Sequence, residues 1–203
     1  MLVDLQNIYN KFASTYEENR VVFDMTEIIN DFYNNLFFKE GELLDLACGA
    51  GEPFAKFFID NNWQVTGVDF SKKMLEMANK FVPKMQTMYN DVTKVEFKSN
   101  KFNAITMIYS LFHLKNEEQF KLLNKIYNWL IPNGSILFTY ATKEYTGFDE
   151  FEDYKEFLGE NLFYAHKTPK SLEKELKHIG FKNISFIYRN IAGETFLWVT
   201  AQK

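Results

Sequence analysis

The chain has 203 residues, of which 46% are hydrophobic and 25% charged, and this composition predicts one globular domain with a sizeable core. The formal net charge is −4 and the only arginines are Arg20 and Arg189, which argues against a strong binding face for phosphate or nucleic acid. The single cysteine, Cys48, excludes an internal disulfide, and the three histidines lack the close spacing of a metal site, so no metal is expected.

Two helices are predicted before the first strand. The first extends through Arg20, and the second covers residues 25–38, where apolar side chains recur at intervals of three and four. These apolar residues are Met25, Ile28, Ile29, Phe32 and Leu36. The chain therefore begins with a helical segment.

Strands and helices alternate in the middle of the chain. The predicted strands cover residues 43–47, 65–69, 85–90, 102–109 and 135–140. The helices between them begin or end at residues that favour helix termini, namely Pro53, Ser71, Asn116, Thr168 with Pro169, and Gly180. The Asn116 helix is expected to end at residues 132–134, a Pro-Asn-Gly sequence.

The C-terminal residues alternate as two strands of a hairpin would, over 184–188 and 196–200, joined through residues 190–194. Parallel neighbours need crossover connections, which the intervening helices supply. The predicted fold is therefore α/β, a doubly wound Rossmann-like sheet of seven strands. It is mostly parallel, with a C-terminal antiparallel hairpin and two N-terminal helices, in a single domain over residues 1–203.

The turn after the first strand carries the chemical signal. Gly49 and Gly51 let the backbone approach a ligand closely, and the following helix exposes N–H donors. Asp69, which ends the second strand, is placed to accept hydrogen bonds from the hydroxyls of a ribose. These features predict a nucleoside-containing cofactor. NAD is one candidate, but Phe54 replaces a small residue of the dinucleotide motif, and Asp45 would repel a pyrophosphate.

In order and spacing, these segments resemble the class I S-adenosylmethionine (SAM)-dependent methyltransferases. The resemblance is carried by five segments over nearly the whole chain, at residues 44–51, 65–71, 89–92, 102–113 and 130–134. Three positions depart from the family pattern. Ala47 replaces a glycine, Glu52 stands where threonine is common, and Asn103 replaces an aspartate.

The resemblance implies a role for each matched residue in binding SAM and its product S-adenosylhomocysteine. Asp69 would hold the ribose, Asp91 would accept from the adenine amino group, and Tyr16 would close a lid formed by residues 1–40. The implied cofactor-binding set is Tyr16, Asp45, Ala47, Gly49, Gly51, Asp69, Phe70, Met74, Asn90, Asp91, Val92 and Tyr109. Asp45 and Asp91 also have purely structural interpretations, as satisfied or turn-forming acids.

No catalytic base is established by the pattern. The candidates are His113, Tyr16 and Tyr140, and both His113 and Tyr140 also suit simple packing. The predicted function is methyl transfer from SAM to a small-molecule acceptor. The alternative is a SAM-binding regulatory or accessory protein without turnover.

The connection at residues 143–167 is much longer than usual, and we expect it to be an inserted substrate lid. Phe148, Phe151, Tyr154 and Leu158 recur at helical spacing and predict a helix. Phe163 and Tyr164 would complete an aromatic wall. A small acceptor that is apolar or cationic is expected.

The expected setting is cytoplasmic, because the N-terminus does not resemble an export signal and no apolar run is long enough to cross a bilayer. No nucleic-acid or membrane partner is expected, and the oligomeric state is left open.

Overall fold

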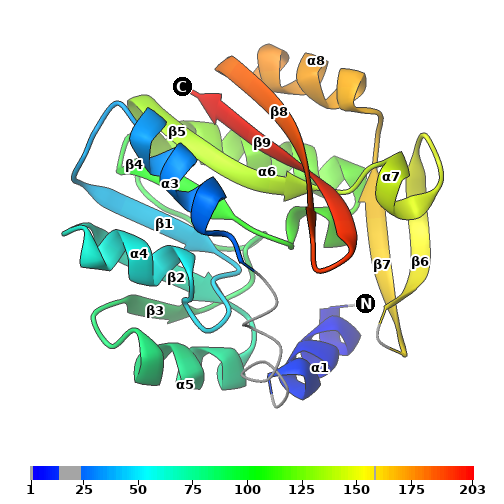
Figure 1. The fold of residues 1–203 in the computed structure, drawn as a ribbon, viewed down its shortest axis with the longest axis horizontal. Coiled ribbons are helices and arrows are strands. Elements are labelled where there is room, and N and C mark those ends of the chain that lie inside the picture. Colours follow the sequence, from blue (N-terminus) through cyan, green and yellow to red (C-terminus); the bar gives the residue numbers. More distant parts are fainter. Residues whose placement is uncertain (1, 14–23, 158) are drawn as a thin grey trace.

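Seven strands form the central sheet of the protein (Figure 1), in the order β3-β2-β1-β4-β5-β9-β8. The computed structural model describes residues 2–13, 24–157 and 159–203. The sheet strands are β1 (Glu42–Leu46), β2 (Gln64–Asp69), β3 (Gln86–Tyr89), β4 (Phe102–Met107), β5 (Leu130–Tyr140), β8 (Lys182–Ile191) and β9 (Glu194–Gln202). The first five pair in parallel, and β9 pairs antiparallel with both β5 and β8. The predicted fold class is confirmed.

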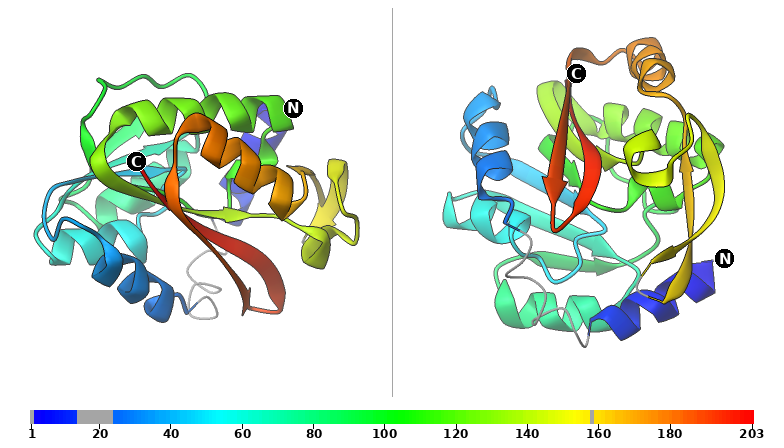
Figure 2. Two further views of the ribbon diagram at one scale, coloured as in Figure 1. Left: turned by 90° about the horizontal axis from the view of Figure 1, so that it is seen from above. Right: turned by 45° about the vertical axis from the view of Figure 1, so that its right-hand side comes forward.

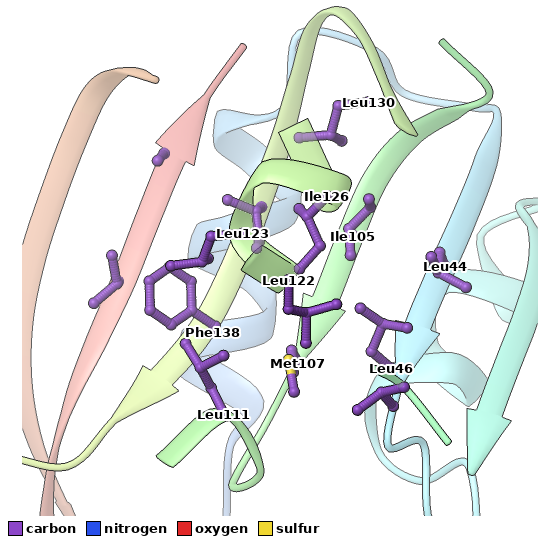
Figure 3. Packing of buried hydrophobic residues seen from close by; sticks show 14 of the residues in the cluster. Leu44, Leu46, Ile105, Met107, Leu111, Leu122, Leu123, Ile126, Leu130 and Phe138 are labelled. Atoms are coloured by element: carbon purple, nitrogen blue, oxygen red, sulfur yellow. The ribbon is translucent and has the colours of Figure 1, made fainter. Parts of the chain in front are cut away.

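Helices cover both faces of the sheet (Figure 2). On one face α3 (Thr26–Asn35), α4 (Phe54–Asp60) and α5 (Lys72–Phe81) share a core with β1 and β2. On the other face α6 (Asn116–Trp129) and α8 (Pro169–Ile179) pack on β4, β5 and β9. Figure 3 shows Leu122, Leu123 and Ile126 of α6 pointing at Ile105 and Phe138 of the sheet. This apolar packing positions the strand ends and the loops that follow them.

Several helix termini lie where the sequence predicts them. The Ser71 side chain accepts a hydrogen bond from Met74 N–H at 3.2 Å, and Thr168 caps α8 in the same way. Gly180 ends α8 with a φ of +117°, where a Cβ would come within 3.0 Å of the Tyr127 side chain.

Two boundaries were predicted wrongly at α6. Its N-cap is Lys115 rather than Asn116, and the Lys115 N–H donates to Glu118 at 3.2 Å, so the acid supplies the capping contact. The strand β5 begins at Leu130, five residues before the predicted Ser135, with a shift of register opposite Phe102. Leu130 already pairs with Phe102 of β4, so β5 includes residues 132–134, where the Pro-Asn-Gly sequence predicts a turn.

The connection at 143–167 does not contain the predicted helix. It forms a short α7 (Lys143–Thr146) and an antiparallel pair, β6 (Phe151–Phe157) with β7 (Glu160–His166). Phe148 and Tyr154 are exposed, whereas residues 162–165 of β7 are buried. Burial of β7 against the rest of the chain outweighs the helical periodicity of the preceding segment. Leu158 lies outside the described residues.

The N-terminal helix α1 (Leu2–Phe12) lies beside α5 and near the free end of the β6–β7 pair (Figure 1). Ile8 of α1 shares an apolar cluster with Phe112, Leu162 and Phe196. The rest of the first predicted helix, with Tyr16, lies outside the described residues. In the parts of the chain that the structure describes, no helix is long and apolar enough to cross a membrane.

Candidate cofactor and substrate cleft

A cavity of about 710 Å³ lies at the carboxyl ends of the parallel strands. Ligands bind at this end of doubly wound sheets, and the volume is within the range of small-molecule sites. One part of the wall, the glycine-turn half, comes from residues 45–49, 69–74 and 91–92. The opposite part, the aromatic half, is formed by Tyr9, Tyr109, Phe112, His113, Tyr145, Tyr164 and Glu194.

The turn after β1 has an unusual backbone. Ala47 has a φ of +56° and Gly49 a φ of +52°, in the left-handed region that favours glycine. That conformation costs an alanine on the order of 1–2 kcal/mol, so the surrounding contacts must hold Ala47 in place. A Cβ on Gly49 would meet no protein atom within 4 Å, which leaves the backbone open to a ligand. Gly51 differs, since a Cβ there would come within 3.0 Å of Val82 and Met85.

Asp69 connects the two loops of the glycine-turn half. Its Oδ2 accepts from Gly49 N–H at 2.9 Å and its Oδ1 from Ser71 N–H at 2.7 Å. The carboxylate is buried and faces the cavity, and desolvation raises its pKa. Each carboxylate oxygen can accept a second hydrogen bond, so Asp69 can hold the turn and also bind hydroxyl groups of a ligand.

Asp45 places a second buried carboxyl group in the same half. Its Oδ1 accepts from Thr106 Oγ1 at 2.7 Å, and desolvation, with the charge of Asp69 adding, raises its pKa to about 7. Among the described residues, no ion pair joins a cation to Asp45 or Asp69. Two buried acids without such a partner favour a ligand that carries positive charge.

The far end of the glycine-turn half has the features of a purine site. Phe70, Met74 and Val92 supply apolar surface. The Oδ1 of Asp91 accepts from the N–H and hydroxyl of Thr93, both at 2.8 Å. Its Oδ2 is buried without a hydrogen-bond partner among the described residues, and Lys94 Nζ lies 3.7 Å away as an ion-pair partner. Such an oxygen suits an amino donor of a ligand.

The helix α1 covers this end of the cavity. Gln6 donates hydrogen bonds to the Phe70 carbonyl and to the Tyr89 hydroxyl, and the Tyr9 ring meets Phe70 edge-on at 6.1 Å. The Asn10 side chain accepts from Ser71 Oγ at 2.7 Å. The described part of the N-terminal segment therefore lies over the cavity wall.

His113 is buried in the aromatic half, between two partners. Its Nδ1 lies 2.8 Å from the Phe163 carbonyl oxygen, which can only accept, so Nδ1 carries the proton in the neutral ring. Its Nε2 then accepts from the Tyr9 hydroxyl at 3.1 Å. Desolvation lowers the pKa of His113 to about 4, which keeps the ring neutral at pH 7.

The other predicted site residues divide between wall and core. Tyr109 lines the cavity with a φ of +51°, and its N–H donates to Thr139 Oγ1 at 2.5 Å. Tyr140 is fully buried, accepts from Lys167 N–H at 2.8 Å and is not among the lining residues. Asn90 and Gly51 also lie outside the lining, and Asn90 Oδ1 accepts from Asp91 N–H at 2.8 Å.

The structure also brings unpredicted residues to the cavity. Tyr9, Tyr145 and Glu194 all line it, from α1, α7 and the start of β9. Ser110 lines it as well, and its Oγ is buried without a hydrogen-bond partner among the described residues. No local sequence motif identifies these residues as part of a site. Glu194, for example, lies at the end of a predicted hairpin turn, where the sequence cannot distinguish it from an ordinary exposed charge.

Residues 43–134 match the model of a methyltransferase domain. The phosphoethanolamine N-methyltransferase of Plasmodium falciparum is 30% identical over 162 residues, which cover 78% of this chain and 59% of that protein. The demethylmenaquinone methyltransferase of Lactobacillus johnsonii is 24% identical, over 93% of this chain and 88% of that protein. The chain therefore spans about three fifths of the first relative.

A solved structure, the DhpI-SAM-HEP complex, has the same fold. It superimposes with a TM-score of 0.72 and 16% sequence identity, over 100% of this chain and 98% of that chain.

Proposed function

The chain belongs to the class I SAM-dependent methyltransferases, and from this we propose that it transfers the methyl group of SAM to a small-molecule acceptor. The observation that carries the proposal is the glycine-turn half of the cavity. It combines an open backbone at Gly49 with two buried acids, Asp45 and Asp69, that lack a cationic partner among the described residues. SAM carries positive charge on its sulfonium and its amino group, which suits Asp45. The ribose hydroxyls of SAM can donate hydrogen bonds to Asp69.

The described residues fit the parts of SAM in order along the cleft. Asp45, Ala47 and Gly49 would surround the methionine part, and Asp69 would bind the ribose hydroxyls. The Oδ2 of Asp91, which accepts no hydrogen bond from a described residue, would accept from the adenine amino group, between Phe70 and Met74. For Gly51 and Asn90 we propose supporting roles, since neither lines the cavity.

Bound SAM supplies a methyl carbon: the acceptor's lone pair forms the new bond, and the electron pair of the broken carbon–sulfur bond stays on sulfur in S-adenosylhomocysteine. The leaving thioether is neutral, so the protein needs no acid on that side. Its main task is to hold the acceptor in line with the methyl group, and such alignment accounts for much of the acceleration in reactions between two bound molecules.

We propose a positioning role for His113. Its buried, neutral ring fixes the Tyr9 hydroxyl, with Nδ1 held by the Phe163 carbonyl. A group with a pKa of about 4 is a weak base at pH 7, so His113 is better suited to orient Tyr9 than to take a proton itself.

Cofactor choice is tested by thermal or urea unfolding with and without ligands. S-adenosylhomocysteine at about a hundred times its dissociation constant should raise the free energy of unfolding by roughly 2.7 kcal/mol. NADH at the same concentration should have no effect. Protection by NADH alone would overturn the assignment in favour of an oxidoreductase.

Turnover is tested separately, with methyl-labelled SAM and a panel of small amines, phenols and thiols. Formation of a labelled product together with S-adenosylhomocysteine is the expected result. Binding of S-adenosylhomocysteine with no product from any acceptor would favour the non-catalytic regulatory or accessory protein. The comparisons lend no support to that alternative, since the relatives reported above are enzymes by name.

A further inference from the structure

The aromatic half of the cavity is lined by one carboxylate, that of Glu194. Glu194 begins β9, directly after the β8–β9 turn, and accepts a hydrogen bond from the Tyr145 hydroxyl. The hydroxyl oxygens of Tyr145 and Tyr164 lie 3.0 Å apart, which extends the network. Tyr9, Tyr109, Tyr145 and Tyr164 line the cavity together with Glu194. Burial raises the pKa of all four tyrosines, and the charge of Glu194 adds to that effect. These hydroxyl groups therefore surround one shared space with Glu194 beside it.

The aromatic rings around this space pack against one another. Phe112 stacks on Tyr164 at 5.4 Å and on Phe196 at 5.0 Å, with interplanar angles of 16° and 15°. Tyr109 meets Phe196 edge-on at 5.3 Å, and Tyr145 packs on Phe196 at 4.4 Å. Ring faces carry partial negative charge, so such an enclosure attracts cations.

The charged residues around the cavity also favour a cationic ligand. Lys56 is the one lysine or arginine that lines it among the described residues, and it is ion-paired with Asp60 at 2.7 Å on α4. Lys155 Nζ lies 5.3 Å from the centre of the Tyr145 ring, but Lys155 is not a lining residue. Burial raises the pKa of Glu194, and the charge of Lys155 only partly opposes this rise. The described wall of the aromatic half therefore offers an acid and no cation.

A neutral or anionic acceptor fits this wall poorly. A neutral planar molecule would take water away from Glu194 without offering a counter-charge, which costs free energy. An anionic molecule would be repelled by the Glu194 carboxylate. A protonated amine matches both the carboxylate and the ring faces.

We infer that the methyl acceptor is an amine that binds as a cation, with its ammonium group between the tyrosine rings and the Glu194 carboxylate. The inference rests on the proposed function and names its substrate class. An ammonium nitrogen has no free lone pair, so one proton must leave before the transfer. Glu194 is placed to take it, which turns carboxylate and ammonium into carboxylic acid and neutral amine.

The test uses two probes of equal shape, choline and its uncharged carbon isostere 3,3-dimethyl-1-butanol. Each is titrated calorimetrically into the protein saturated with S-adenosylhomocysteine. Choline should bind at least about tenfold more tightly than the neutral alcohol, because only choline gains the cation–ring and charge–charge attraction. Glu194→Gln should remove most of this preference and leave the affinity for S-adenosylhomocysteine unchanged. Glu156→Gln, on the exposed side of β6, is the matched control and should behave as the wild type.

Equal binding of the two probes by protein that binds S-adenosylhomocysteine would overturn the inference and leave the proposed function standing. An unchanged preference in Glu194→Gln would likewise overturn the role of that carboxylate. Failure of S-adenosylhomocysteine to bind the wild type would instead overturn the proposed function itself.

Discussion

The two halves of the cleft are built in different ways. The glycine-turn half comes from three short segments, residues 45–49, 69–74 and 91–92, each directly after a parallel strand. The aromatic half is assembled from α1, the loop after β4, α7, β7 and β9, between Tyr9 and Glu194 in the chain. The first half depends on local turns that come together because β1, β2 and β3 are neighbours in the sheet. The second half depends on how distant segments pack.

The halves also differ in their chemistry. The glycine-turn half presents backbone groups and buried carboxylates, and each contact has a recognisable residue type. The aromatic half presents ring faces with one carboxylate, and its residues also form an apolar cluster that ties α1 to β7 and β9. Mutations in the two halves should therefore separate cofactor binding from acceptor turnover.

The largest effect is expected from Asp69→Ala, in the glycine-turn half. The change removes the acceptor for Gly49 and Ser71 N–H and for the ribose, and should weaken binding of S-adenosylhomocysteine by roughly 2–4 kcal/mol. Calorimetry measures the loss, and circular dichroism checks that the variant is folded. Asp69→Asn keeps the shape and one oxygen and should lose less. Unchanged affinity in folded Asp69→Ala would show that this carboxylate does not bind the cofactor.

Shortening the β6–β7 pair should reduce turnover and leave cofactor binding largely unchanged. Residues 156–161 can be replaced by Asn-Gly, because Lys155 and Leu162 face each other across the pair and a two-residue turn can join them. The change removes Phe157 from the cavity wall and the ion pair between Lys11 and Glu160. We expect turnover of an identified acceptor to fall about a hundredfold, with affinity for S-adenosylhomocysteine within about tenfold.

The control for that variant is Glu160→Gln, which removes the ion pair and keeps the strand pair intact. It should retain most of the turnover, because exposed ion pairs contribute little. Full turnover by the shortened chain would show that the 143–167 segment is not a substrate lid.

A smaller effect is expected in the pH dependence of stability without ligand. The pKa of Asp45 rises from an ordinary 3.8 to about 7 through burial, so the folded protein holds a proton that the unfolded chain releases. The contribution of Asp45 to stability should therefore fall as pH rises from about 4 to about 7, by at most about 1.4 kcal/mol per pH unit. His113, whose pKa is lowered to about 4, contributes the opposite slope up to its ordinary 6.5. Urea unfolding at several pH values measures the slope in both proteins, and the slope in Asp45→Asn should be more positive than in the wild type. An identical slope in both proteins would assign the effect elsewhere.

Local signals were sufficient for much of the fold and for the glycine-turn half. Ser71 and Thr168 cap their helices as predicted, and Gly180 ends α8, because each acts on backbone groups within a few residues. Of the predicted cofactor residues that are described, all but Gly51 and Asn90 line the cavity. Local signals failed at residues 151–157, where the segment with helical spacing of aromatic residues is a strand, β6, paired with β7.

The sequence by itself therefore determined the alternation of strands and helices, the open turn at Gly49 and the acids Asp45 and Asp69, because short-range conformational preferences specify them. Only the tertiary structure decided that β9 lies between β5 and β8 and so carries Glu194 to Tyr145, Tyr164 and Tyr9. That half depends on burial and pairing between separate segments, from α1 near the start of the chain to β9 near its end, which no local pattern in the chain encodes.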